Sequence, residues 1–164
     1  MRERLPDLDV SVSVTTRPPR SAERDGVDYS FITDEAFDRM VERGELLEWA
    51  EIFGHRSGTP AQPIDDALAD GRNVLLEIDV QGARQVRDAR PDAVLIFLEP
   101  PSLTELERRL RTRATEDEDK LRRRLAKAAW EQSQRGWFDH VVVNDDLESA
   151  SSQVAAIIEG SRTA

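Results

Sequence analysis

The segment VSVSVTTRPPR, which runs from Val10 to Arg20, decides the fold of this chain. Valine occupies every second position at its start, and this period-2 pattern predicts a half-buried strand. Two prolines then separate Arg17 from Arg20. Because proline fixes φ and restricts the residue before it, we expect a stiff, extended arm that presents two guanidinium groups. Such an arm can bind a phosphate or a carboxylate. The alternative is a solvated loop with incidental arginines.

The composition predicts one globular domain without a membrane span or a signal peptide. The chain has 164 residues, of which 34% are charged, and this length is sufficient for one hydrophobic core. No apolar run approaches the roughly 20 residues of a membrane-spanning helix, and the charged start MRERLPDLD lacks the apolar part of a signal peptide. Cysteine is absent, which excludes a disulfide framework and is compatible with a cytoplasmic protein.

The net charge of -10 argues against a general nucleic-acid-binding or membrane-binding protein. The positive charge is unevenly placed, since arginines gather at 17–24 and at 108–124. A local arginine cluster in an acidic chain points to a bound phosphate group. We therefore expect an anionic small molecule as ligand, and neither nucleic acid nor membrane as partner.

Most of the chain alternates between strand and helix patterns, which predicts an α/β fold with a parallel sheet. Strands are expected at 10–15, 29–32, 73–79, 93–98 and 141–143. Helices are expected after the capping residue Thr33 and at 63–69, 81–87, 102–113, 115–134 and 147–158, with a capping box of Ser102 and Glu105. Residues 54–59 predict a turn. Because 11–59 lack the alternation, we interpret them as a smaller mixed lobe inserted into the core.

Two candidate sites follow from the first half of the chain. Arg17 and Arg20 with Tyr29 could hold one phosphate, although Tyr29 is equally compatible with a core or rim aromatic. Glu48 lies in an apolar segment, where a carboxylate needs a partner. It could accept the N1–H and N2–H₂ of guanine as a pair, which adenine does not offer. The alternative for Glu48 is an acid in water on a helix face or strand edge.

Two further acids, Glu77 and Asp79, follow an apolar run. Ligands of open parallel sheets bind beyond the carboxyl ends of the strands, where acids hold Mg²⁺ directly or through water, or orient a substrate. The alternative is that they cap the next helix.

Arginines flank a polar segment at 111–119 that we interpret as a lid. Arg109, Arg113 and Arg124 could close over a transferring phosphoryl group and neutralise its charge. The alternative is ordinary ion pairing along helices, since RRLRTR precedes EDED.

Taken together, these residues resemble the guanylate kinase family, in particular its bacterial and actinobacterial members. The matching blocks run in order over almost the whole chain: SVSVTTRPPR, DGVDYSF, ELLEWAEIFG, SGT, LEIDVQGA, IFLEPPS, RRLRTRATE, RRRL and VVVNDD. The resemblance implies that ATP and GMP are converted to ADP and GDP with Mg²⁺. It also implies a P-loop-kinase-like parallel core at about 60–110 and 120–160, an inserted GMP-binding lobe at about 11–59 and a short lid at about 111–119.

The resemblance assigns roles position by position. The residues on the phosphate of GMP or dGMP would be Arg17, Arg20 and Tyr29. The residues around guanine would be Ser13, Glu48, Thr59 and Asp79, with Glu48 as the main discriminator. The catalytic arginines of the lid and phosphate clamp would be Arg109, Arg113 and Arg124. ATP would be bound by Arg113, Arg124 and Asn144, and Asp79 is a candidate Mg²⁺ ligand through water.

The chain departs from the family pattern at several positions. Ser57 stands where a tyrosine often contacts GMP, and the adjacent Arg56 could compensate. Glu77 stands where aspartate is common, and Ala114 stands where glycine is usual, which would stiffen the lid.

The largest departure is that the P-loop, GxxGxGK[ST], is absent. The only lysines are Lys120 and Lys127, and neither follows a glycine. A P-loop wraps the ATP phosphates with backbone N–H groups and a lysine, and the strand that feeds it is central to the sheet. The first residues, RERLP, resemble the end of the helix that follows a P-loop. We therefore favour truncation over true loss, and expect little or no kinase activity from these 164 residues.

Two functions remain in competition at this stage. The first is a nucleoside monophosphate kinase that is complete in its biological form. The second is a non-catalytic guanylate-kinase-like module that binds GMP or a phosphorylated partner. The lid arginines and Asp79 have a role only with ATP, which favours the kinase. The sequence does not indicate an oligomeric state.

Overall fold

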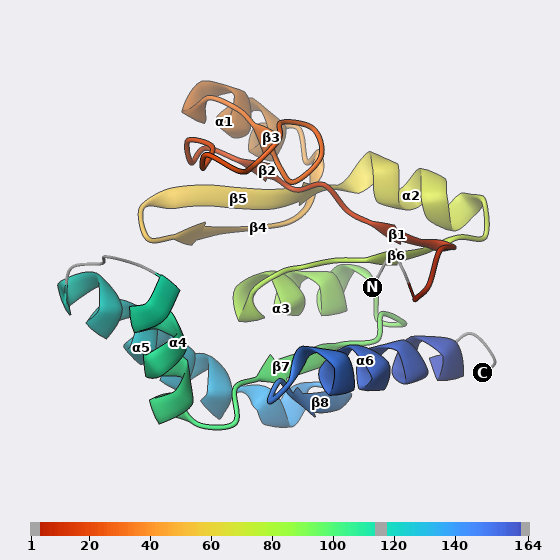
Figure 1. The fold of residues 1–164 in the computed structure, drawn as a ribbon. Helices are drawn as coiled ribbons and strands as arrows, with labels where there is room; N and C mark the ends of the chain where they lie inside the picture. Colours follow the sequence, from red (N-terminus) through yellow and green to blue (C-terminus); the bar gives the residue numbers. More distant parts are fainter. Residues whose placement is uncertain (1–3, 114–117, 162–164) are drawn as a thin grey trace. The chain divides into compact units, whose positions relative to one another are not determined.

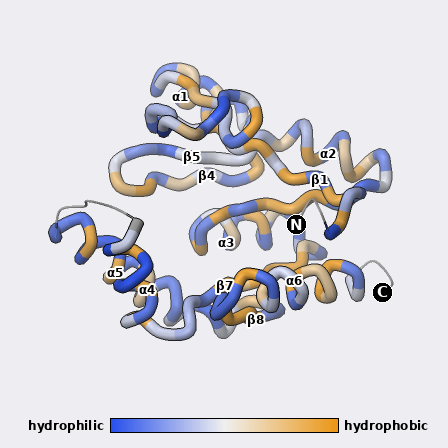
Figure 2. Tube along the Cα trace, in the orientation of Figure 1, coloured by the Kyte–Doolittle hydropathy of each residue, from blue (hydrophilic) through white to orange (hydrophobic). Residues whose placement is uncertain are grey.

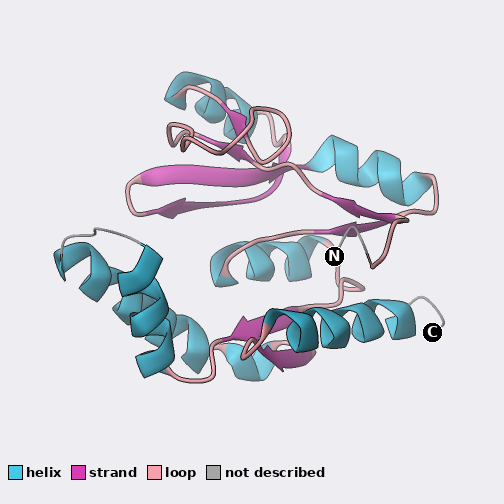
Figure 3. Ribbon diagram, viewed as in Figure 1, coloured by secondary structure: helices cyan, strands magenta, loops and turns pink. Residues whose placement is uncertain are grey.

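The computed structural model describes residues 4–113 and 118–161, which form two compact units that meet in sequence between Ala93 and Val94 (Figure 1). Each unit combines helices with at least one pair of parallel strands (Figure 3). This confirms the predicted α/β class with parallel sheet elements, and the described strands form no closed barrel. The expected boundaries of lobe, core and lid stay predictions. None of the described helices is long and apolar enough to cross a bilayer.

The first unit carries a mixed sheet and a small parallel sheet. Its elements are β1 (Leu8–Val10), β2 (Val14–Thr15), β3 (Ser30–Phe31), α1 (Asp34–Glu42), β4 (Leu46–Ile52), β5 (His55–Pro60), α2 (Ala61–Ala69), β6 (Asn73–Leu75) and α3 (Val80–Ala89). Four strands pair in the order β3-β2-β5-β4, with β2 and β3 parallel and the other pairs antiparallel. Strands β1 and β6 form the parallel pair.

The opening strand is divided between these two sheets, so the prediction of one strand over 10–15 is wrong. Strand β1 ends at Val10, the Ser11 N–H still donates to the Leu75 carbonyl (3.0 Å), and β2 begins at Val14. The Ser13 carbonyl already accepts from Ser30 in the second sheet (2.9 Å). The alternation of side chains continues while the pairing partner changes, and for this reason the period-2 pattern could not show the break.

Residues 55–59 of the segment expected to be a turn at 54–59 lie in strand β5, which corrects that prediction for all but Gly54. The turn consists of Phe53 (φ 53°) and Gly54 (φ 81°), and two positive φ values are typical of a two-residue hairpin turn. Inside β5, a Cβ at Gly58 would lie 2.8 Å from the Glu48 carbonyl oxygen and 2.9 Å from the Trp49 Cβ. Gly58 is therefore required by close packing of the strands, although in the sequence it looks like a turn residue.

The second unit contains β7 (Ile96–Glu99), α4 (Leu103–Arg113), α5 (Glu118–Ser133), the 3₁₀ helix η1 (Arg135–Trp137), β8 (His140–Val143) and α6 (Leu147–Ser161). Strands β7 and β8 are parallel, with Ile96 opposite His140. The predicted lid is helical at 111–113 and 118–119, and its centre at 114–117 lies outside the described residues. Ala114, which stands where the family usually has glycine, falls in that part.

Helix starts were predicted well from capping residues. The Thr33 hydroxyl accepts the Ala36 N–H (3.2 Å), and the Ser102 hydroxyl accepts the Glu105 N–H (3.1 Å). The prediction that Glu105 completes the capping box is wrong. Its carboxylate accepts hydrogen bonds from arginines of its own helix instead.

In the first unit, residues of high hydropathy are frequent along β6 and the segment that leads into α3 (Figure 2). Phe37 of α1 is fully buried. Its ring meets Trp49 edge-on at 6.1 Å between centroids, and the Arg56 guanidinium carbon lies 4.9 Å from its centroid.

Truncation of Phe37 to alanine is expected to lower the free energy of unfolding by about 3–5 kcal/mol, because the surrounding residues cannot fill the cavity. Urea denaturation measures the loss. The control Leu68→Ala removes a side chain that is 46% exposed, and should change stability by about 0.5 kcal/mol or less. A loss below about 1 kcal/mol for Phe37→Ala would contradict its role in the core.

Candidate functional site

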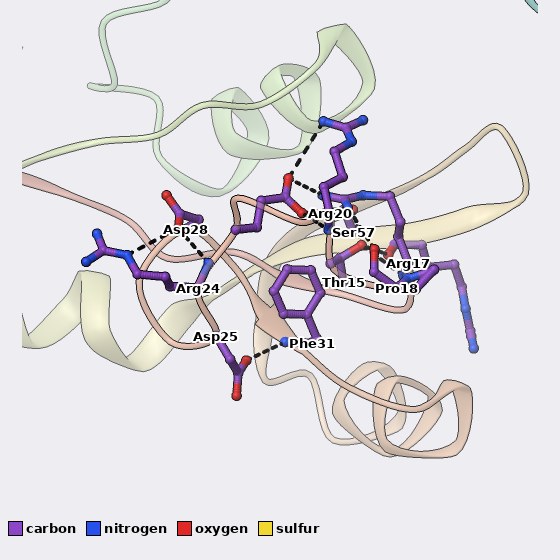
Figure 4. A network of polar contacts seen from close by, with 11 residues as sticks. Thr15, Arg17, Pro18, Arg20, Arg24, Asp25, Asp28, Phe31 and Ser57 are labelled. Atoms are coloured by element: carbon purple, nitrogen blue, oxygen red, sulfur yellow. Dashed lines mark hydrogen bonds and ion pairs between the residues drawn. The ribbon is translucent and has the colours of Figure 1, made fainter. Parts of the chain in front are cut away.

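The arginine arm folds around a carboxylate that sequence reasoning missed (Figure 4). The two oxygens of Glu23 accept from the Arg17 Nη1 (2.8 Å) and Nη2 (2.9 Å), and one of them also accepts the Arg20 backbone N–H (2.7 Å). These bonds, chiefly those from Arg17, lower the pKa of Glu23 to about 2. The arm therefore holds a carboxylate of its own chain, while the binding of a phosphate by Arg17 and Arg20 stays a prediction. An acid three residues after Arg20 was the available signal.

Aromatic rings support the guanidinium of Arg17. Its Cζ lies 5.3 Å from the ring centroid of Tyr29 and 5.7 Å from that of Phe31, distances typical of cation–π contacts. The structure thus brings Tyr29 together with Arg17, and the role of the two residues in phosphate binding stays a prediction. The side chain of Arg20 is 68% exposed, and its Nη1 lies 3.7 Å from Glu23.

Hydroxyl groups connect the arm to strand β5. The Ser57 Oγ donates to the Thr15 Oγ1 (2.9 Å), which in turn donates to the Arg56 carbonyl (2.9 Å). The Arg56 side chain binds Asp34 (2.8 Å) and Asp38 of α1. It is therefore directed to α1, and these contacts give no support to the idea that it replaces a tyrosine at position 57.

Glu48 is buried, which excludes the alternative of an acid in water. Its side chain belongs to β4 and the residue is only 5% exposed. The Thr59 Oγ1, on the paired position of β5, donates to the Glu48 Oε1 (2.6 Å). Burial raises the pKa of the Glu48 carboxyl, the Thr59 hydrogen bond opposes this shift, and the charge of Asp79 adds to it. No arginine or lysine of the described residues pairs with this carboxylate.

Strand β5 contributes one residue to each of these two hydrogen-bonded sites. Ser57 donates to Thr15, and Thr59 donates to Glu48. The two residues are two positions apart and so face the same side of the strand. Two residues of a strand span about 6.6 Å. One strand of the first unit thus contributes a residue that contacts Thr15, just before the arginine arm, and a residue that contacts Glu48.

Of the two acids after β6, only Asp79 caps the next helix as the alternative predicted. The Asp79 Oδ1 accepts the N–H groups of Gln81 (3.0 Å) and Gly82 (2.9 Å) at the start of α3. Glu77 is exposed. Ser13 contributes its backbone carbonyl to the sheet. No cluster of three or more acidic, histidine or cysteine side chains that could hold a metal alone occurs in residues 4–113 and 118–161.

In the second unit, Arg109 joins α4 to the segment after β8. Its Nε binds Glu105 (2.8 Å), while Nη1 and Nη2 donate to the carbonyls of Asn144 (2.8 Å) and Asp145 (2.9 Å). The structure therefore brings Arg109 and Asn144 together. Hydrogen bonds from Arg108 and then Arg109 lower the pKa of Glu105 to about 2.

The other two arginines of the predicted clamp lie on the helices that flank 114–117. Arg124 is half-buried on α5, and Arg113 ends α4. The side chain of Arg113 lies outside the described residues. The three residues predicted for ATP and the predicted catalytic Arg109 thus all belong to the second unit, while those predicted for GMP belong to the first.

Comparisons with known proteins agree on one family. A family model described as guanylate kinase matches residues 3–161. A guanylate kinase of Mycobacterium sp. (strain MCS) is 54% identical over 166 residues, which cover 100% of this chain and 84% of the relative. One of Synechococcus sp. (strain CC9311) is 51% identical, with 94% and 81% covered. The crystal structure of guanylate kinase from Anaplasma phagocytophilum matches with a TM-score of 0.85 at 35% identity, and covers 99% of this chain and 80% of that one.

Proposed function

The chain belongs to the guanylate kinase family, and on this basis we propose that its first unit binds GMP as the acceptor of the γ-phosphoryl group of ATP. The observation that carries the proposal is Glu48, a buried carboxylate without a cationic partner among the described residues, in the same unit as the arginine arm. Guanine supplies two adjacent N–H donors, which satisfy such a carboxylate. The arginine arm supplies the charge that a phosphate needs.

In the proposed reaction, an oxygen of the GMP phosphate forms a bond to the γ-phosphorus of ATP. The bond between that phosphorus and the bridging oxygen breaks, and ADP leaves with the electron pair, so that GDP and ADP result. Arg17, Arg20 and Tyr29 would hold the attacking phosphate. The phosphate would either replace Glu23 as the partner of the arginine arm or bind beside it. The chain's contribution is positioning and charge neutralisation, since phosphoryl transfer requires little other chemistry from the protein.

On the ATP side, Arg109, Arg113, Arg124 and Asn144 are the proposed residues, with Asn144 near adenine. Because Arg109 is anchored to the segment after β8, we assign it the task of fixing that segment beside the nucleotide. Mg²⁺ usually takes only one or two carboxylates and otherwise binds water and substrate phosphates, so Asp79 fits as a ligand through water. When bound with ATP, the ion would neutralise charge on the phosphoryl oxygens.

A second candidate function is a non-catalytic module that binds GMP or a phosphorylated partner. The observation that favours it is that all residues predicted for GMP belong to the first unit, while those predicted for ATP belong to the second. Binding of GMP is common to both functions, whereas turnover is expected only where ATP is also held.

Calorimetric titration tests the shared part. We expect GMP to bind more tightly than AMP by at least about tenfold, because one bidentate base contact contributes about 1–3 kcal/mol of discrimination. Guanosine should bind more weakly than GMP, because it lacks the group that the arginine arm holds. Equal affinities for GMP and AMP, or no binding of GMP at millimolar concentration, would contradict the proposal.

A further inference from the structure

The backbone conformation at Gly82 does not require a glycine. Gly82 is the third residue of α3, it is buried, and its φ is not positive. Alanine would suit a helix better there, because glycine is a poor helix former. A glycine inside a helix therefore calls for a packing reason.

The packing reason is the carboxylate of Glu48. A Cβ built on Gly82 would overlap the Glu48 Oε2 and would lie 3.0 Å from its Cδ, and it would also lie 3.3 Å from the Ile78 Cβ. The hydrogen of Gly82 thus leaves the space in which the carboxylate sits. Thr59 holds the other carboxylate oxygen from the opposite strand, so the group is fixed between β5 and the start of α3.

Helix α3 cannot withdraw to make room for a side chain. One turn after Gly82, the Gln85 amide accepts the Trp49 N–H through Oε1 (3.1 Å) and donates to the Trp49 carbonyl through Nε2 (2.7 Å). These two bonds fix the helix to the backbone of β4 at the residue that follows Glu48. Both elements belong to the first unit, where α3 lies alongside β4 (Figure 1).

The helix start also offers a favourable electrostatic setting. The N-terminal end of α3 carries partial positive charge, which favours the ionised form of a nearby carboxylate. A side chain at position 82 would move the Glu48 carboxylate away from this end. The buried group would then lose both its position and part of its compensation for desolvation.

We propose that Gly82 is a positioning residue for base recognition, which seats the Glu48 carboxylate so that it accepts both N–H donors of a 2-amino-6-oxopurine. The inference rests on the proposed function, in which Glu48 binds guanine. It gives helix α3 a role in base specificity that depends on the absence of a side chain at position 82.

The test is Gly82→Ala, with GMP, IMP and AMP titrated by calorimetry. GMP should bind at least tenfold more weakly, and its preference over IMP, which lacks the 2-amino group, should fall toward 1. AMP affinity should change less than twofold, because the arginine arm is untouched. The matched control is Gly160→Ala in helix α6, where an added Cβ meets no atom of the described residues within 4 Å outside its own stretch of helix, and it should leave all three affinities unchanged.

The double variant Gly82→Ala/Glu48→Asp separates positioning from general damage. Aspartate is one methylene shorter, so the overlap disappears, and Gly82→Ala should change GMP affinity less than twofold in the Glu48→Asp background. If Gly82→Ala alone does not fold and the double variant does, the overlap is supported. GMP binding within twofold of wild type for Gly82→Ala, equal weakening of all three nucleotides, or failure of both variants to fold would overturn the inference. Lack of a GMP preference in the wild-type chain would instead overturn the proposed function.

Discussion

Replacement of Glu48 by glutamine is expected to weaken GMP binding by roughly 10- to 100-fold and to abolish the preference for GMP over AMP. A carboxylate offers two acceptor oxygens, whereas a carboxamide offers one acceptor and one N–H₂ donor. One guanine N–H would then face another donor, and the loss of a bidentate base contact costs about 1–3 kcal/mol. Glutamine has nearly the same shape, so its oxygen can still accept from Thr59 and the fold should persist.

The pH dependence of binding distinguishes this mechanism from a shape effect. Burial raises the pKa of Glu48, so its ionised fraction falls at a higher pH than that of an ordinary glutamate. Only the ionised form accepts both guanine donors, and GMP affinity should therefore decrease as the pH is lowered through the raised pKa. Glu48→Gln should lack this component, while the titration of the GMP phosphate affects both proteins equally. Identical pH profiles would contradict the assignment.

A matched control lies on the same strand. Glu51 is exposed on β4, and Glu51→Gln removes the same charge without access to the buried position. It should leave the affinity for GMP within twofold of wild type. The role of Glu48 would be disproved if Glu48→Gln itself bound GMP within twofold of the unmodified chain.

Local signals predicted the parts of the fold that depend on nearest neighbours. Thr33 and Ser102 cap helices because a hydroxyl before a helix can accept a free N–H whatever the rest of the chain does. The identity of the pairing partner is not local. The strand expected over 10–15 changes sheets between Val10 and Val14, and no side-chain pattern records which strand lies next to it.

In the candidate site, too, residue type predicted some features, while others depend on the fold. Residue type alone indicated that Arg17 binds an oxyanion and that Glu48 needs a partner. The nature of the partners came only from the structure, because Glu23 and Thr59 reach those groups through the folding of a loop and through strand register. Gly82 was invisible in the sequence, since its importance lies in an atom that it does not have.

The chain of 164 residues is expected to form GDP at least about 10³-fold more slowly than a guanylate kinase that carries the P-loop. Removal of a single preorganised donor from an active site already costs about 10²–10³ in turnover. A P-loop supplies several backbone N–H groups and a lysine to the ATP phosphates. Neither Lys120 nor Lys127 follows a glycine, so the sequence offers no replacement. ADP formation from ATP and GMP, followed in a coupled assay, measures the rate.

Two controls make this result decisive. Calorimetry should show that GMP still binds, because the contacts of Arg17 and Glu48 are made within the first unit. Residual turnover should also disappear in Arg17→Ala, since activity that survives this substitution comes from a contaminating host enzyme. A rate within tenfold of a P-loop-containing relative, sensitive to Arg17→Ala, would show that the arginines of the second unit hold ATP without a P-loop. That outcome would contradict the expectation that binding of the γ-phosphate requires a P-loop.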